Sequence, residues 1–202
     1  MTPIALTPPQ PLTPEALADL ARSCHADSVA AGWWEPLEPA ADTAREQMRA
    51  DLIGSEVGEA LDALRRPERP LAHVTAEGKP DGYLVEVADT AIRSLDLLGR
   101  VIARQPVEPV FMAWVALGMQ ETNPDSPRLT AWHHLVWFAL LWLPNKPKSD
   151  NLSQLFTIRR LSCIVDLCAK ETARHDADLV TLINLKRAYN RIRGTRHGGL
   201  SV

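Results

Sequence analysis

Two pairs of acidic residues have the spacing of a metal site. Glu56 and Glu59 are three residues apart, and Glu86 and Asp89 repeat this spacing. Residues at i and i+3 share one face of an α-helix, so each pair would project two carboxylates in one direction. If the two helices pack antiparallel, four carboxylates converge at the edge of the core. Clustered anions require protons or cations, and hard oxygen ligands favour Mg²⁺, with Mn²⁺ as a possible substitute, over zinc.

Acidic pairs of this kind also occur on ordinary solvated helix faces, which is the alternative interpretation. A set of basic and polar residues near the C-terminus bears on the choice between a metal site and a solvated helix face. Lys186, Asn190 and Arg193 lie at i, i+4 and i+7, and therefore share one helix face, in a segment from Leu179 to Val202 that has no acidic residue. An arginine fork and a lysine point charge together suit a phosphate group. A solvated or nucleic-acid-binding basic tail is the alternative.

Helical periodicity dominates the elements that must position these residues. Thr13, Pro14 and Glu15 form a helix start, with a hydroxyl N-cap, proline in the first turn and an acid beside it. Gly32 is a plausible stop for that helix. Apolar residues at three- and four-residue steps predict further helices over about 42–66, 85–104, 155–173 and 178–193. We therefore expect an all-α fold, most simply an antiparallel helical bundle.

The remaining segments suggest an arm and an insertion. Residues 1–13 are rich in proline and are expected to be a flexible arm, followed by a single domain over 14–202. Residues 106–148 are interpreted as a helical insertion, with an apolar stretch around Val110 to Met119 and a Trp-rich helix over Leu129 to Leu143. That second helix holds about 15 residues, whereas a membrane-spanning helix needs roughly 20, so no membrane association is expected.

The amino-acid composition is that of a folded globular protein. In 202 residues, 46% are hydrophobic and 23% charged, which excludes a disordered chain. The net charge of −3 provides no global attraction to nucleic acid, so an anion site must be local. Three cysteines do not form a disulfide framework, and no secretory or transit signal is evident. A cytoplasmic location is the simplest expectation.

Four segments together resemble the MazG-like all-α nucleoside triphosphate pyrophosphohydrolases, in their order and in their spacing. They are Gly32-Trp33-Trp34, Ser55 to Leu61 around the first acidic pair, Lys79 to Asp89 around the second, and Lys186 to Arg193 followed by His197-Gly198-Gly199. The similarity covers about 16–103 and 155–200, and leaves the insertion without a counterpart.

The resemblance implies hydrolysis of a nucleoside triphosphate, either a (d)NTP or a noncanonical one, to the monophosphate and pyrophosphate. In that family four acids hold Mg²⁺, and by position these are Glu56, Glu59, Glu86 and Asp89. Lys186, Asn190 and Arg193 become phosphate contacts, and Trp34 is expected to stack on the nucleobase. Members generally form homodimers or homotetramers, and the Trp-rich helix would suit a subunit contact. Ser55 stands where some dUTP-preferring relatives carry a further carboxylate, which leaves the water-activating group open.

Two other functions are considered. Phosphoribosyl-ATP pyrophosphohydrolase has similar acidic helices, but is usually shorter and lacks the Gly32-Trp33-Trp34 element. A non-enzymatic helical oligomer with a basic, nucleic-acid-binding C-terminal tail is the alternative from a different class.

Asp96, seven residues after Asp89, falls near the same helix face and is expected to orient a ligand or, more simply, to form a surface ion pair with Arg93.

Overall fold

The computed structural model describes residues 1–34, 39–104, 109–120, 136 and 151–193, and in these residues the chain is predominantly helical. Its elements in chain order are β1 (Thr2–Pro3), α1 (Pro14–Ala30), α2 (Pro39–Leu64), β2 (His73–Val74), β3 (Pro80–Asp81), α3 (Tyr83–Ala103), α4 (Pro109–Gln120), α6 (Asn151–Ala173) and α7 (Leu179–Arg193). The expected all-α class is confirmed. None of the helices in the described residues is long and apolar enough to span a membrane.

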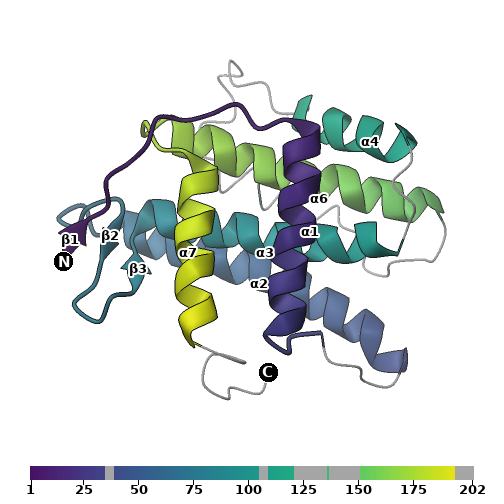
Figure 1. Ribbon diagram of the computed structural model, residues 1–202, viewed down its shortest axis with the longest axis horizontal. Helices are drawn as coiled ribbons and strands as arrows, with labels where there is room; N and C mark the ends of the chain where they lie inside the picture. Colours follow the sequence, from purple (N-terminus) through teal and green to yellow (C-terminus); the bar gives the residue numbers. More distant parts are fainter. Residues whose placement is uncertain (35–38, 105–108, 121–135, 137–150, 194–202) are drawn as a thin grey trace.

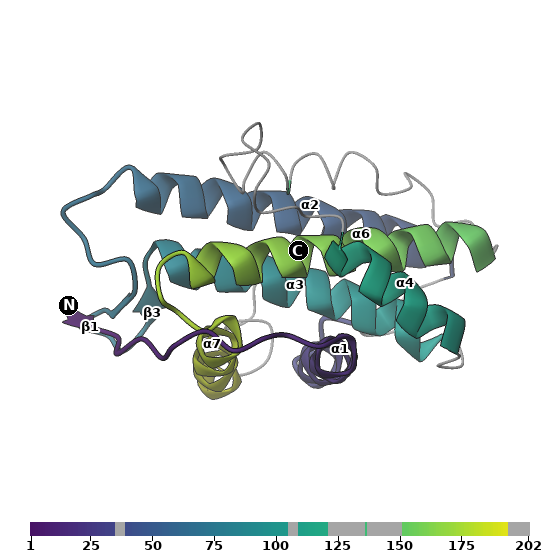
Figure 2. The ribbon, with the colours of Figure 1, turned by 90° about the horizontal axis from the view of Figure 1, so that it is seen from above.

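The helices form two sets that cross each other (Figures 1 and 2). Helices α2, α3 and α6 run lengthwise, with α3 antiparallel to both of the others, as a bundle predicts. Helices α1 and α7 lie side by side across them, so the arrangement differs from a simple antiparallel bundle. Helix α3 packs against α1, α2, α6 and α7 and is the central element of the fold.

The start of α1 follows the sequence prediction closely. The Thr13 hydroxyl accepts a hydrogen bond from the amide of Ala16 at 3.2 Å, and Pro14 is the first helical residue. A cap of this type stabilises a helix by about 1 kcal/mol. Leu17 and Ala21 are fully buried, which turns the apolar face of α1 toward α3.

Helix α3 is buried on nearly all sides because its sequence combines aliphatic residues with small ones. The buried hydroxyls of Thr90 and Ser94 donate to the carbonyl oxygens of Glu86 and Thr90, at 3.0 and 2.9 Å, and are thereby satisfied. At Gly99 an added Cβ would overlap the backbone of Ala21 and the side chain of His25 on α1. The absence of a side chain at Gly99 therefore sets how closely α1 approaches α3.

The connection from α2 to α3 folds back as a short hairpin, in which β2 pairs antiparallel with β3. Gly82 precedes α3 with φ of 109°, a value that L side chains rarely adopt, and an added Cβ would lie 2.8 Å from the carbonyl oxygen of Leu71. Glycine at this position lets the chain enter α3 directly below the hairpin. The first turns of α3 then carry the second acidic pair.

The N-terminal segment 1–13 differs from the expected flexible arm, because it is hydrogen-bonded to the domain at several points. Strand β1 pairs antiparallel with β2, and the amide of Ile4 donates to the carbonyl of Ala72 at 3.1 Å. Farther along, the amide of Asp178 donates to the carbonyl of Thr7 at 2.9 Å. Two-residue strands leave no periodic pattern, so the sequence did not reveal these contacts.

The predicted insertion is described in part. The apolar stretch around Val110 to Met119 forms α4, which packs chiefly on α6. The Trp-rich helix expected over 129–143 lies outside the described residues apart from Val136, which is fully buried.

Candidate metal centre

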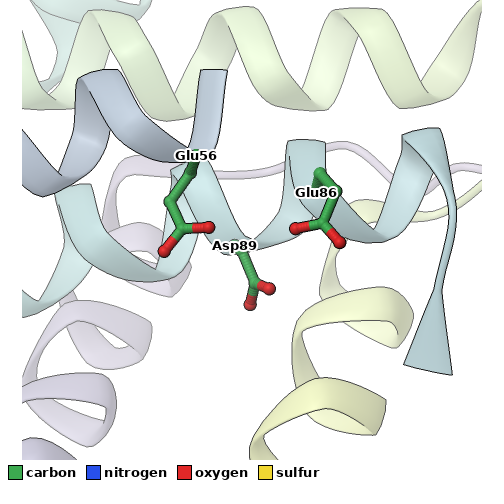
Figure 3. A group of neighbouring side chains, drawn as sticks. All are labelled: Glu56, Glu86 and Asp89. Carbon is green, nitrogen blue, oxygen red and sulfur yellow. The ribbon is translucent and has the colours of Figure 1, made fainter. Parts of the chain in front are cut away.

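Three carboxylates from two helices meet beside the core. Glu56 projects from α2, and Glu86 and Asp89 project from α3, all toward the side of the molecule where α1 and α7 lie (Figure 3). One oxygen from each residue lies within 4.8 Å of the others. The three residues are only 4–8% exposed. The predicted convergence of the two acidic pairs is therefore present for these three residues.

This convergence follows from the packing of α2 on α3. Ile53, Val57 and Ala60 on α2 are fully buried, as are Leu84 and Ala88 on α3. Each acidic residue lies next to this apolar stripe on its own helix, so the packing that buries the stripe also brings the carboxylates together.

Glu59, the fourth predicted ligand, lies at the margin of the cluster. Its side chain is exposed, and it is not part of the group whose oxygens approach within 4.8 Å. Partial burial and, secondarily, the charge of Glu56 raise the pKa of Glu59 above its ordinary value. Glu59 is therefore coupled electrostatically to the cluster and faces solvent.

Two basic side chains compensate the buried carboxylates. Lys186 on α7 forms an ion pair with Asp89, and the Nε of Arg93 on α3 donates to the Oε1 of Glu56 at 2.9 Å. With three carboxylates and two cations fully ionised, the cluster has a net charge of −3 + 2 = −1. The positive charges at the site therefore do not fully compensate the ionised carboxylates.

Burial is the main cause of the shifted pKa values of the two glutamates in the cluster. Burial, opposed by Lys186 and reinforced by Asp89, raises the pKa of Glu86 to about 8. Burial also raises the pKa of Glu56, against the opposing charge of Arg93. Burial alone would lower the pKa of Lys186, but the attraction of Asp89 and Glu86 raises it above its ordinary value.

The other predicted phosphate contacts diverge along α7. Asn190 is half-buried, and its Oδ1 is enclosed without a hydrogen-bond partner in the described part of the chain. Arg193 is exposed, and its guanidinium lies 5.5 Å from the ring centroid of Tyr189. The structure brings Lys186 to the acidic cluster and leaves Arg193 at the surface. His197 to Gly199 lie outside the described residues.

Trp34 belongs to a polar network centred on Asp96, which is 3% exposed. Asp96 accepts hydrogen bonds from the Nε1 of Trp34 and the Oγ of Ser28, both at 2.8 Å, and its Oδ1 lies 2.9 Å from the Nδ1 of His25. The expectation of a surface ion pair between Asp96 and Arg93 was therefore wrong. Asp96 ties α1 to α3, and Arg93 pairs instead with Glu56.

Two guanidinium groups, from Arg49 and Arg100, lie 5.1 and 5.2 Å from the ring centroid of Trp34. The ring of His25 packs edge-on against the same indole. The contacts described for Trp34 are thus with protein groups. Its neighbour Trp33 lines a small cavity.

Two cavities flank the acidic cluster along α3. The larger, of about 430 Å³, includes Glu59 and Glu86 in its lining and lies between the end of α2, the hairpin and the start of α3. The smaller, of about 80 Å³, lies between α1, α3 and α7, and its lining includes Trp33, Arg93, Asp96 and Asn190. Glu86 and Arg93 are seven residues apart, or two helical turns, so the cluster separates the two cavities.

Sequence reasoning missed several residues of this site. Arg93 lies four residues after Asp89 and seven after Glu86, so helical spacing alone could have placed it on the acidic face of α3. Arg66, Arg69 and Lys79 line the larger cavity. They come from a loop and a hairpin, where no periodicity indicates which side chains meet.

No family model, curated protein or solved structure matches this chain. The functional interpretation is therefore argued from the geometry of the site and from the sequence motifs.

The donor set of the cluster fits a hard divalent cation. All three converging groups supply carboxylate oxygens, which Mg²⁺ and Mn²⁺ prefer. When ionised, the three buried carboxylates exceed the two adjacent basic groups by one charge, which an additional divalent cation would compensate in competition with protons. Glu59, at the open side of the cluster, could add a fourth oxygen ligand after a change of its side-chain conformation.

Proposed function

We propose that this protein is a Mg²⁺-dependent nucleoside triphosphate pyrophosphohydrolase of the MazG-like type, which converts a (d)NTP or a noncanonical NTP into the monophosphate and pyrophosphate. The observation that carries the proposal is the convergence of Glu56, Glu86 and Asp89, buried and within 4.8 Å of one another, beside a charged cavity. Of the motifs that resemble this family, Ser55 to Leu61 lie on α2, Lys79 to Asp89 on the hairpin and α3, and Lys186 to Arg193 on α7.

Glu56, Glu86 and Asp89 would hold the metal, with Glu59 as a further ligand. When bound, Mg²⁺ neutralises phosphate charge and lowers the pKa of coordinated water. Arg93 keeps Glu56 oriented and favours its ionised form through the 2.9 Å hydrogen bond. Glu59 has no ion pair in the described residues and is exposed, so its carboxylate is available to accept a proton from water.

The remaining side chains would bind the substrate. Lys186 is the basic residue already at the cluster, and its ammonium would contact the α-phosphate side of the triphosphate. The nucleoside would extend along α3 toward the smaller cavity, whose lining includes Trp33 and Asn190. Trp34 would then hold Asp96, which lines this cavity, in place through its hydrogen bond, and would not stack on the base itself.

The direct test is an assay of pyrophosphate release across a panel of canonical and modified ribo- and deoxynucleoside triphosphates. We expect release from at least one nucleotide in Mg²⁺ or Mn²⁺ and none after addition of EDTA. The monophosphate should form in equal amount, which distinguishes this reaction from stepwise phosphate removal. Absence of pyrophosphate from every nucleotide would contradict the proposal.

A matched pair of variants on α2 connects the activity to the cluster. Glu56→Gln removes a buried ligand at nearly constant volume, and we expect turnover to fall by at least about a hundredfold, in the range typical of groups that stabilise transition-state charge. Asp51→Asn changes an exposed carboxylate on the same helix and should leave turnover unaltered. Circular dichroism of both variants would show that α2 remains folded.

A further inference from the structure

The larger cavity contains charged groups that the metal site does not use. We call it the hairpin cavity because residues of β2, β3 and the adjoining loop line it. Figure 1 shows these strands beside the start of α3. Its volume is about 430 Å³, and its charged or titratable lining residues are Glu59, Asp62, Arg66, Arg69, His73, Lys79, Asp81 and Glu86. The acidic cluster lies at one edge, through Glu86.

Two arginines of the hairpin cavity have no ion-pair partner among the residues that the structure describes. Asp62 is paired with Arg65, at 2.9 Å, and Asp81 faces both Lys79 and His73, at 3.9 and 3.5 Å. Arg66 and Arg69 form no ion pair in the described part of the chain. The lining of the cavity therefore combines carboxylates of the acidic cluster with two arginines that have no ion pair in the described residues.

His73 adds a buried polar atom to the lining. The residue is 1% exposed, and its Nδ1 lies 3.3 Å from the carbonyl oxygen of Pro70. A carbonyl only accepts, so Nδ1 carries the proton and donates in this contact. The Nε2 atom is buried without a hydrogen-bond partner in the described residues, although an unsatisfied buried polar atom is costly. With Nδ1 protonated, Nε2 of the neutral ring is an acceptor, 3.5 Å from the Oδ2 of Asp81, so a donor such as a metal-bound water would satisfy it.

The start of α3 also favours an anion at this place. Gly82 and Tyr83 line the hairpin cavity, and α3 continues from Tyr83 for 21 residues. The N-terminal end of such a helix has partial positive charge and suits phosphate groups. The end of α3 and the two arginines thus line the same cavity and both favour an anion there.

We propose that the hairpin cavity is the subsite for the β- and γ-phosphates of the substrate and so for the pyrophosphate product. This inference rests on the proposed function and deepens it. In the hydrolysis, the water oxygen forms a bond to the α-phosphorus, and the bond from that phosphorus to the bridging oxygen breaks. The electron pair leaves with pyrophosphate, which Arg66 and Arg69 would hold, and the proton of the water passes to a carboxylate or to solvent.

The dimensions of α3 agree with this direction of binding. Glu86, at the hairpin cavity, and Asp96, at the smaller cavity, are ten residues apart, which corresponds to about 15 Å of helix. An extended nucleoside triphosphate spans a comparable length. Its pyrophosphate end would then occupy the hairpin cavity and its nucleoside would extend toward the smaller cavity, which at about 80 Å³ holds only part of it, with the α-phosphate at the acidic cluster between them.

Titration calorimetry with pyrophosphate, in a buffer with excess Mg²⁺, tests the subsite without any turnover. We expect the wild-type protein to bind magnesium pyrophosphate, and Arg66→Ala/Arg69→Ala to bind it about tenfold more weakly through loss of charge-assisted hydrogen bonds. Arg65→Ala is the matched control: Arg65 is an exposed neighbour paired with Asp62, and it does not line the cavity. An unchanged thermal unfolding midpoint would show that both variants fold.

The outcomes separate this inference from the proposed function. Arginine-dependent binding of pyrophosphate in a protein that hydrolyses no nucleotide would support the subsite and contradict the enzyme assignment. Nucleotide hydrolysis with equal pyrophosphate affinity in the wild type and the double variant would support the enzyme assignment and overturn the subsite. Failure of the wild type to bind magnesium pyrophosphate would also overturn the subsite.

Discussion

The ammonium group of Lys186 on α7 is ion-paired with the carboxylate of Asp89 on α3, and both side chains are buried. This pair joins the last described helix to the acidic cluster. The positive charge of Lys186 therefore already neutralises part of the negative charge that would attract a metal ion. Lys186 therefore has two effects, since it stabilises the metal-free protein and competes with a metal for the charge of Asp89.

Replacing Lys186 with methionine should reveal both effects. The free energy of unfolding measured in EDTA should fall by about 3–5 kcal/mol, as is typical when one partner of a buried ion pair is removed. The affinity for Mn²⁺, measured by calorimetry, should rise because the cluster becomes more negative. If the proposed function is correct, the Michaelis constant for the nucleotide should also increase.

Lys170→Met provides the control, because Lys170 forms an i, i+4 ion pair with Asp166 on α6, away from the cluster. It should leave Mn²⁺ affinity unchanged. Weaker metal binding by Lys186→Met would show that this lysine supports the cation site and does not compete with it.

Much of the site could be predicted because it depends on local periodicity. The i, i+3 spacing of Glu86 and Asp89 places both on one face of α3, and the apolar residues beside them determine which helix that face meets. Lys186 was predicted to contact a phosphate group of the substrate, and that role stays a prediction. In this structure the anion that Lys186 contacts is the protein's own Asp89.

The remaining features of the site depend on contacts between segments that are distant in the sequence, and helical periodicity does not encode these contacts. The crossing of α1 and α7 over α3 decides that Asp96 meets Trp34 and that Arg93 turns to Glu56. Helical spacing correctly places Asp96 near the acidic face. It does not show that α1 covers this position and converts it into a buried acceptor.

The raised pKa of Glu86 predicts a distinctive dependence of stability on pH. Its pKa is about 8 in the folded protein, against 4.5 as its ordinary value, so the folded state binds this proton more tightly than the unfolded state. Its contribution therefore favours folding at low pH and is lost as the pH rises from about 4.5 to 8. In EDTA, Glu86→Gln should be more stable than the wild type at pH 8 by on the order of 2 kcal/mol.

Urea unfolding at pH 5 and pH 8 measures this difference. The advantage of Glu86→Gln should be small at pH 5, and Glu68→Gln, an exposed change in the loop after α2, should show no advantage at either pH. Excess Mg²⁺ should stabilise the wild type at pH 8 and not Glu86→Gln. Equal pH dependence of the two proteins in EDTA would contradict the shifted pKa.

The Asp96 network should be structurally important. Asp96→Ala leaves the buried groups of Trp34, Ser28 and His25 without their acceptor, and each unsatisfied group costs about 1–3 kcal/mol. We expect a loss of about 3 kcal/mol in chemical denaturation, together with a change in tryptophan fluorescence. Asp62→Ala, which removes an exposed ion pair with Arg65, should cost about 1 kcal/mol at most. Similar losses in the two variants would argue against a buried network.

Two glycine-to-alanine substitutions should have opposite signs, because the two glycines meet different surroundings. At Gly99 a new Cβ would overlap Ala21 and His25, so Gly99→Ala must separate α1 from α3 and should destabilise the protein by about 1–3 kcal/mol. At Gly58, on the exposed face of α2, nothing lies within 4 Å of the new Cβ. Alanine is the better helix former, so Gly58→Ala should stabilise by up to about 1 kcal/mol. Thermal unfolding of both variants measures the contrast, and a neutral Gly99→Ala would show that α1 and α3 do not pack as closely as the structure places them.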